Sequence, residues 1–277
     1  MASQRGNGEA GGSMTAAPVT SPRVPAKPAL AVTEVGKKFG GVEAVRDVSL
    51  TVAPGHVLGV IGPNGSGKTT LINLLTGVYR ADRGSIQVAG RETSRLRASR
   101  VAGLGVARTF QNPHVFATLT VRQNLMMALR HSVRAGRQAG RSEAGDIDRW
   151  LGLTGLADKA DHVASELSGG QRKLVEFARA MARRPLLVLM DEPFAGVYPA
   201  VKRVLHDQIR QLAASGETAF LIVSHEIPDL IDLSDQFICM AAGAVLKAGD
   251  PAEVCRDEAV IDAYLGASHP VLRNGAA

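Results

Sequence analysis

Alternating and continuous runs of apolar residues predict short strands along most of the chain. Some runs alternate with polar residues, which is typical of strands with one exposed face. Others are apolar almost throughout, which is typical of parallel strands covered on both faces. The alternating strands cover residues 30–35 and 47–52, with a predicted loop at 37–41 between them. The other predicted strands cover residues 56–61, 85–88, 106–110, 186–190 and 218–223.

Helical spacing replaces these short runs in two parts of the chain. Between residues 120 and 155, apolar residues recur every three or four positions from Val121, and residues 146–153 predict a short second helix. A third helix follows Ser168. Residues 130–145 are rich in arginine and glycine. Because no aromatic residues interleave with these arginines, we interpret the stretch as a solvated connection rather than a nucleic-acid-binding patch.

Composition narrows the class of protein. The chain has 277 residues and is 45% hydrophobic, enough for the core of one α/β domain. No apolar run approaches the roughly 20 residues of a membrane span, so any membrane association would be peripheral or through a partner. The aromatic fraction of 4% argues against stacking of single-stranded nucleic acid. Cys239 and Cys255 form neither a disulfide framework nor a metal-binding spacing, which favours a reducing cytoplasm.

A glycine-rich stretch between a predicted strand and a predicted helix carries the clearest chemistry. Its glycines let several backbone N–H groups point at phosphate oxygens, and the helix N-terminus adds partial positive charge. Lys68 supplies a full charge for the phosphates, and the Thr69 hydroxyl can bind Mg²⁺. A simple glycine-rich turn does not account for the complete pattern. The predicted nucleotide-binding residues are Gly62, Pro63, Asn64, Gly65, Ser66, Gly67, Lys68, Thr69 and Thr70.

A second helix start of this kind follows at residues 167–171. Ser168 is well placed as an N-cap, and Gly169 and Gly170 leave backbone N–H groups uncovered for an anion. Taken alone, a helix cap that binds no ligand explains this stretch equally well.

Two carboxylates and a histidine follow buried strands. Asp191 and Glu192 come directly after residues 186–190, where two adjacent charges are costly without a nearby cation. Asp191 suits Mg²⁺ coordination and Glu192 suits a base for water, although both could instead cap the next helix. His225 follows residues 218–223, at the sheet edge where α/β proteins bind ligands, although a lone histidine is more often structural.

Together these residues resemble the ATP-binding subunits of ABC transporters over residues 30–266. Residues 62–70 match the Walker A motif, and residues 167–171 read LSGGQ, the signature motif of that family. Residues 188–193 resemble the Walker B strand with its catalytic glutamate. The resemblance implies an α/β P-loop NTPase fold, with a RecA-like core, an antiparallel β subdomain and an inserted α-helical subdomain.

The resemblance also implies further site residues and a domain organisation. Gln111 falls where the family's Q-loop glutamine lies, as a catalytic residue and Mg²⁺ ligand, and His225 where its switch histidine lies. Phe39 falls where the family stacks an aromatic ring on adenine; on spacing alone, it could equally plug the end of a sheet. The predicted bounds are 1–28 for a disordered leader, 29–268 for the ATPase domain, about 112–168 for its helical subdomain and 269–277 for a flexible tail.

The partners implied by the resemblance are other polypeptides rather than nucleic acid. Two ATPase subunits, identical or different, would pair head to tail around two ATP molecules with Mg²⁺. In each site Lys68 and Glu192 of one subunit would meet Ser168 and Gly170 of the other. The helical subdomain would dock on transmembrane permease subunits, at the cytoplasmic face of the inner membrane. A solute-binding protein would take part indirectly.

Within this family, the sequence is most similar to branched-chain amino acid transporter ATPases. The stretches that carry this similarity are residues 105–113, 119–125, 191–197 and 263–266. Urea and lipopolysaccharide-export ATPases share much of it and stay as alternatives. A soluble ABC ATPase acting on ribosomes or DNA is a further alternative, but such proteins usually carry two cassettes or a long coiled coil. Tyr198 stands where the family has Asn or Asp, which leaves open a nucleotide-binding regulator without turnover.

Two further departures accompany Tyr198. Residues 223–226 read Val-Ser-His-Glu, where this branch of the family commonly has Glu-His-Asp. Residues 240–243 read Met-Ala-Ala-Gly and also differ from the sequence usual at that turn. The change at Tyr198 affects the predicted communication between the two ATP sites rather than nucleotide binding itself.

Overall fold

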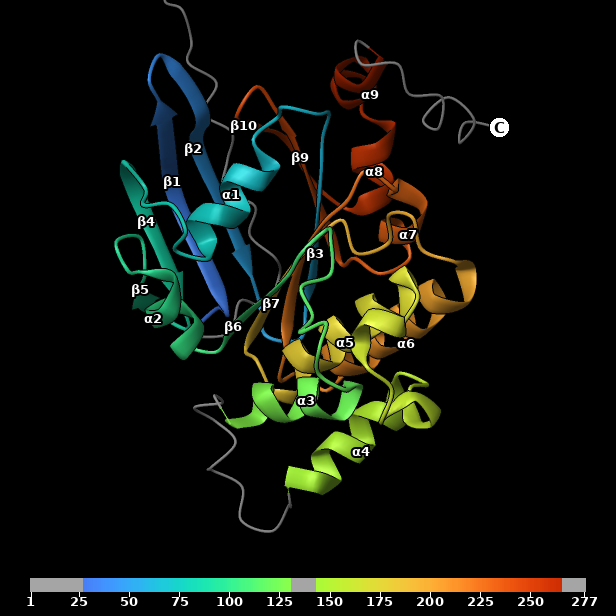
Figure 1. Cartoon of the computed structure of the whole chain (residues 1–277). Coiled ribbons are helices and arrows are strands. Elements are labelled where there is room, and N and C mark those ends of the chain that lie inside the picture. The colour runs from blue at the N-terminus through green and yellow to red at the C-terminus, as the bar shows by residue number, and fades with distance from the viewer. Residues whose placement is uncertain (1–26, 131–142, 266–277) are drawn as a thin grey trace, which may run out of the picture.

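The computed structural model describes residues 27–130 and 143–265 of the 277-residue chain. Two β-sheets lie side by side in it, with helices gathered at the far end of the larger sheet (Figure 1). The tail predicted at 269–277 lies outside the described residues, as do most of the predicted leader and of the arginine-rich connection. Across the described ranges, no helix is long and apolar enough to cross a bilayer.

The larger sheet, within the described ranges, has six strands in the order β10-β9-β3-β8-β7-β6. All neighbouring strands from β9 to β6 pair in parallel, and β10 pairs antiparallel to β9. The carboxyl ends of β3, β8 and β7 therefore meet at one edge of the sheet. The bounds are Val57–Ile61 for β3, Val106–Thr109 for β6, Leu187–Asp191 for β7, Ala219–Val223 for β8, Gln236–Ala241 for β9 and Ala244–Gly249 for β10.

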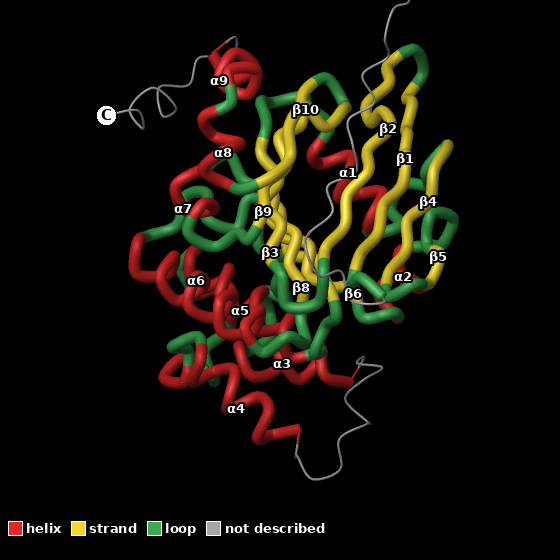
Figure 2. The backbone as a smooth tube through the Cα atoms, turned by 180° about the vertical axis from the view of Figure 1, so that it is seen from behind, coloured by secondary structure: helices red, strands yellow, loops and turns green. Residues whose placement is uncertain are grey.

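The smaller sheet is antiparallel, and the part of the chain that is described gives it four strands in the order β2-β1-β4-β5. In Figure 2 it stands at one side of the molecule, away from α4 to α7. The bounds are Leu30–Phe39 for β1, Val42–Val52 for β2, Arg83–Val88 for β4 and Arg91–Glu92 for β5.

Helices follow most strands of the larger sheet and cover it. Helix α1 begins directly after the loop that leaves β3, and α5 packs against α3, α4 and α6. The bounds are Lys68–Leu75 for α1, Ala98–Gly103 for α2, Val121–Arg130 for α3, Glu143–Leu153 for α4, Gly169–Ala182 for α5, Pro199–Ala214 for α6, Ile227–Ile231 for α7, Pro251–Arg256 for α8 and Glu258–Leu265 for α9.

Side chains of the central strands alternate between two hydrophobic clusters. On β7, Val188 and Met190 pack with residues of α5 and α6, while Leu187 and Leu189 pack with α1 and the smaller sheet. All four are at most 1% exposed. The strand is apolar on both faces because both faces are covered, as the sequence pattern predicted.

The predicted loop at residues 37–41 is confirmed only at 40–41 and is wrong at 37–39. β1 continues to Phe39 and β2 begins at Val42, and these two residues pair across the turn. This end of the hairpin reaches past the core: Lys38 and Phe39 are exposed and Lys37 is half-buried. Without a buried face, the hairpin end lacks the alternation that marks the rest of the strand.

Candidate active site

The loop between β3 and α1 depends on glycine at two places. Gly62 and Gly67 have φ values of 148° and 102°. A Cβ at Gly62 would lie 2.2 Å from the carbonyl oxygen of Met240, and one at Gly67 would lie 2.4 Å from that of Ala44. Only glycine allows the backbone to curl this closely against its neighbours. The loop therefore presents the first N–H groups of α1 to its concave side, as an anion requires.

Lys68, the first residue of α1, is folded back into this loop. Its Nζ donates to the carbonyl oxygens of Gly62 at 2.7 Å and Pro63 at 2.9 Å, and lies 3.4 Å from the Ser66 hydroxyl. The residue is 9% exposed. Burial lowers the pKa of Lys68, while nearby carboxylates of Glu192 and Asp191 act in the opposite direction. An anion bound at this loop would favour the charged form of Lys68, because its negative charge offsets the cost of burying the ammonium group.

One cleft of about 690 Å³ brings most of the predicted site residues together. The loop residues 64–70 form one wall, and Gln111, Asp191, Glu192 and His225 come from the ends of β6, β7 and β8. Gly62 and Pro63 lie at the base of the loop, outside the lining. The parallel order of these strands explains the gathering, because their carboxyl ends share one edge of the sheet.

Asp191 ends β7 beside an arginine that the sequence analysis did not single out. The guanidinium of Arg108, on β6, lies 3.4 Å from the Asp191 carboxylate and donates to the Asn73 side chain at 2.6 Å. Burial raises the pKa of Asp191, and Arg108 opposes that rise. The sequence does carry one signal for Arg108: it is a charged residue within the predicted strand at residues 106–110.

Glu192 is held in a left-handed backbone conformation, with φ of 50°. Its N–H donates to the carbonyl oxygen of Val223 at 2.8 Å. Its carboxylate accepts from the Ser224 hydroxyl and the His225 N–H, both at 3.2 Å, and lies 2.8 Å from Nδ1 of His225. A non-glycine residue at positive φ is uncommon and costs energy, and active sites are one place where such residues cluster. The alternative of a helix cap is wrong, because α6 begins only at Pro199.

Lys173 supports Glu192 from the side of α5. Its Nζ donates to the carbonyl oxygens of Glu192 and Pro193, both at 3.2 Å, and of Ala195 at 2.9 Å. This contact fixes the segment after β7 against α5. Sequence reasoning missed it, because the pattern shows only a lysine on the polar face of a helix.

Ser168, Gly169 and Gly170 lie outside this cleft. The Ser168 hydroxyl accepts from the Gln171 N–H at 3.2 Å, and the Gln171 side chain accepts from the Ser168 N–H at 2.9 Å. This reciprocal capping confirms the predicted N-cap. Ser168 and Gly169 are exposed. Within one chain the structure does not bring this helix start to the Lys68 loop.

Phe39 also stands outside the lining of the cleft. It is 42% exposed, and its ring meets that of Tyr79 edge-on at 5.1 Å between centroids. This exposure contradicts the alternative that Phe39 plugs the end of a sheet. An exposed ring fixed by a neighbouring aromatic remains available for stacking.

The oxygen donors in the cleft fit a hard divalent cation. The Thr69 hydroxyl, the Gln111 amide and the Asp191 carboxylate all line it. Mg²⁺ prefers such oxygen ligands and is bound by one or two carboxylates together with substrate phosphates. No cluster of three or more histidine, cysteine or carboxylate ligands occurs among residues 27–130 and 143–265. The donor set therefore matches Mg²⁺ held jointly with a phosphate.

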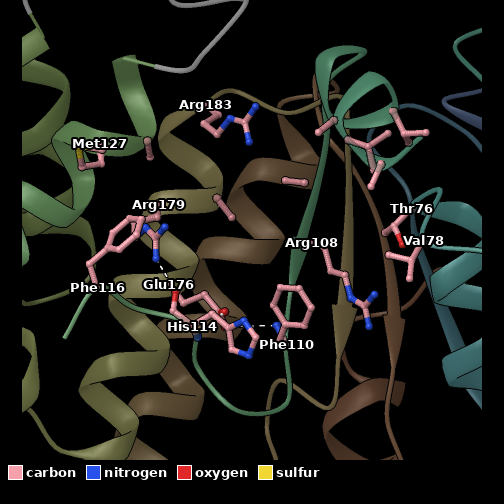
Figure 3. Close-up of a pocket in the computed structure, with 17 residues that line it drawn as sticks. Thr76, Val78, Arg108, Phe110, His114, Phe116, Met127, Glu176, Arg179 and Arg183 are labelled. Carbon is pink, nitrogen blue, oxygen red and sulfur yellow. Dashed lines mark hydrogen bonds between the residues drawn. The ribbon is translucent and has the colours of Figure 1, made fainter. Parts of the chain in front are cut away.

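A second pocket of about 440 Å³ opens between β6 and helices α2, α3 and α5. Figure 3 shows Phe110, His114, Phe116 and Arg179 around it. The buried carboxylate of Glu176 accepts from the N–H groups of Phe110 at 3.3 Å and His114 at 2.9 Å. Gln111 lies on the segment that this carboxylate holds, so the pocket and the cleft share one loop.

The fold and the cleft define a P-loop protein of the α/β class that binds nucleoside triphosphates. A family model described as "ABC transporter" matches residues 45–195, more than half of the chain. A second model, described as "Branched-chain amino acid ATP-binding cassette transporter", matches residues 248–270. The chain belongs to the ABC transporter family, which confirms the resemblance stated from its motifs.

Related proteins and solved structures agree with this assignment. The chain is 35% identical over 251 residues to the high-affinity branched-chain amino acid transport ATP-binding protein LivG of Salmonella typhimurium, covering 87% of this chain and 98% of that protein. It is 36% identical over 255 residues to a probable LivG of Archaeoglobus fulgidus, covering 89% and 98%.

Among solved structures, the chain resembles the ADP conformation of an ATP-binding cassette of an ABC transporter. The TM-score is 0.75 at 32% identity, covering 86% of this chain and 99% of that one. A nucleotide-free cassette gives a TM-score of 0.74 at 30% identity, covering 86% and 98%. These similarities confirm the predicted P-loop NTPase fold and an ATPase activity.

Proposed function

We propose that this chain is the ATP-hydrolysing subunit of an importer for branched-chain or related hydrophobic amino acids. The cleft that gathers Lys68, Gln111, Asp191, Glu192 and His225 carries the energy-coupling role. The substrate class is supported by the names of the related proteins and by the family model at residues 248–270. Urea or amide import and lipopolysaccharide export are the alternative substrates, because their ATPases share much of the motif wording.

In the proposed reaction, water attacks the γ-phosphorus of ATP and the bond to the β-phosphate oxygen breaks. Glu192 orients and polarises the water, and His225 holds the γ-phosphate. Lys68 offsets the negative charge that moves during transfer. Thr69, Gln111 and Asp191 would hold Mg²⁺, which supplies further positive charge at the phosphates. Phe39 stacks on the adenine.

We infer that two ATPase subunits act together, as a pair of this chain or with a related chain. Ser168 and Gly170 lie outside the cleft of their own chain, so they serve a nucleotide only across a subunit boundary. Tyr198, at the N-cap of α6, is 80% exposed. A Cβ added at Gly170 would lie 3.2 Å from the Val201 side chain, so the starts of α5 and α6 lie close together.

The permease side of the proposal rests on the pocket beside Gln111. Phe116 is 46% exposed and Met127 is 37% exposed at this pocket, which gives an apolar surface for a transmembrane subunit. The helical subdomain, at about residues 112–168, would form much of this docking surface. The chain would then sit peripherally at the cytoplasmic face of the inner membrane, with a solute-binding protein acting indirectly.

The proposal is tested by transport. Cells that carry only Lys68→Met should lose uptake of labelled leucine, isoleucine and valine, because the variant cannot hold ATP phosphates. Lys247→Met is the matched control: it removes an exposed ion pair with Asp257 at 2.9 Å, and should keep uptake. Loss of urea uptake with normal leucine uptake would overturn the substrate class. Co-purification without any membrane protein would overturn the transporter role.

A further inference from the structure

A buried hydrogen bond joins the phosphate loop to helix α9. The N–H of Gly62, at the start of the loop, donates to the hydroxyl oxygen of Tyr264 at 2.5 Å. Tyr264 lies on α9, 202 positions further along the chain, and is 1% exposed. Its position belongs to the segment matched by the second family model.

Both backbone polar groups of Gly62, its N–H and its carbonyl oxygen, form hydrogen bonds with side chains. The carbonyl oxygen accepts from Lys68 at 2.7 Å, while the N–H donates to Tyr264. In the proposed function Lys68 turns to the phosphates of ATP, so its bond to Gly62 is given up on binding. The Tyr264 bond is made by a different group and does not compete with ATP.

The backbone at Gly62 needs such an anchor. Its φ of 148° is accessible to glycine, which also populates many other conformations. Tyr264 is a rigid partner, because its ring packs in one hydrophobic cluster with Val254 and Val260 of α8 and α9. Burial raises the pKa of the Tyr264 phenol, so the group stays neutral at physiological pH.

We propose that Tyr264 is a positioning residue, which keeps the phosphate loop in its binding shape before ATP arrives. The inference rests on the proposed function of this loop. A loop that is already ordered loses less conformational entropy on binding, so its affinity for ATP is higher. The effect therefore falls on ATP affinity and not on the chemical step at Glu192.

The test compares wild-type protein with Tyr264→Phe, which keeps the ring and removes the hydroxyl. ATP affinity should fall about tenfold, within the range for a buried donor left without a partner, while kcat at saturating ATP stays within about twofold. Thr218→Val is the control, because it removes another buried hydroxyl, bonded to the Pro185 carbonyl at 3.0 Å. Thr218 lies just before β8, at the opposite end of the sheet, so this variant should keep wild-type affinity.

Equal affinity for ATP in wild-type and Tyr264→Phe protein would overturn the inference. So would an equal loss in Tyr264→Phe and Thr218→Val, because that loss would reflect stability alone. Amide hydrogen exchange of Gly62 in nucleotide-free wild-type protein decides the point if Tyr264→Phe fails to fold. Slow exchange supports the anchor, and exchange as fast as in an open loop overturns it. Wild-type protein that binds no ATP would instead overturn the proposed function.

Discussion

Helices α1 and α5 both begin at a glycine-rich turn, yet their surroundings differ. The start of α1 is enclosed by a cleft, with the buried ammonium of Lys68 beside the carboxylates of Asp191 and Glu192. The start of α5 is exposed, and Ser168 and Gln171 already cap each other there. Both segments offer the uncovered N–H groups of a helix N-terminus.

A helix start becomes a binding site through the side chains that face it. At α1 the side chains of Gln111, Asp191, Glu192 and His225 come from the ends of strands of the same chain. At α5 the residues Ser168 and Gly169 are exposed and do not line the cleft that contains Lys68. The α5 start is therefore suited to complete a site on another subunit.

Removal of the proposed base on the α1 side should lower turnover most. Glu192→Gln should lower kcat on the order of 10²–10³-fold, because it removes the group that polarises water. ATP affinity should stay near that of wild-type protein. Phosphate release and nucleotide binding measure the two quantities, with the exposed Glu217→Gln as control. Normal turnover in Glu192→Gln would show that Glu192 is not the base.

The next effect tests whether α5 acts only across subunits. Ser168→Ala should lower turnover on the order of 10–10²-fold, the range for a lost hydrogen bond to a charged group. The affinity of the isolated chain for ATP should not change. The Ser168→Ala variant should also lose about 1 kcal/mol of stability, as expected for a lost N-cap.

Asp250→Ala is the matched control for that variant. Asp250 caps α8 through the N–H of Ala252 at 2.8 Å, away from both helix starts. It should lose similar stability and keep its turnover. An equal fall in turnover for both variants would remove the distinction between the two helix starts.

A smaller effect is expected at Glu176, in the middle of α5, which holds the segment that carries Gln111 to the α1 cleft. Glu176→Gln replaces a carboxylate that accepts two backbone N–H groups by an amide with one acceptor oxygen. The protein should lose about 1–3 kcal/mol of stability, and ATP hydrolysis should fall because the Gln111 segment is less well held. Urea unfolding and phosphate release measure both effects. Exposed Glu166→Gln should change neither.

The smallest effect concerns the buried charge at α1. Burial lowers the pKa of Lys68, so between that lowered pKa and the usual lysine pKa of 10.5 the unfolded chain binds more protons than the folded one. The free energy of unfolding of the nucleotide-free protein should therefore rise with pH in this window. Lys68→Met should abolish the rise, and Ser168→Ala should keep it. Unfolding curves at a series of alkaline pH values check this.

Local patterns were sufficient for the parts of the site that lie next to one another in sequence. The loop at residues 62–70, the carboxylates after β7 and His225 after β8 could be predicted, because each follows a buried strand. Parallel pairing then places those strand ends together, as the register of Asp191 with Val223 shows. The motif resemblance supplied Gln111, which no local pattern indicated.

The supporting residues could not be predicted, because their partners are distant in sequence. Lys173 contacts carbonyl groups about 20 positions away, Arg108 meets Asp191 83 positions away and Tyr264 meets Gly62 202 positions away. Nothing in the local periodicity of a lysine, an arginine or a tyrosine specifies such a partner. The hairpin end at Lys37 and Lys38 could not be predicted for another reason: no core packs against it, so its polar and apolar residues do not alternate.

The three carbonyl contacts of Lys173 have a consequence for the paired enzyme. Lys173 lies on α5 within two turns of Ser168, and it holds the backbone of Glu192. In the proposed pair of subunits, a nucleotide contacted by Ser168 would belong to one site, and the water polarised by Glu192 would belong to the other. If this bridge transmits any preference, linkage makes it reciprocal: ATP in either site changes the affinity of the other by the same factor.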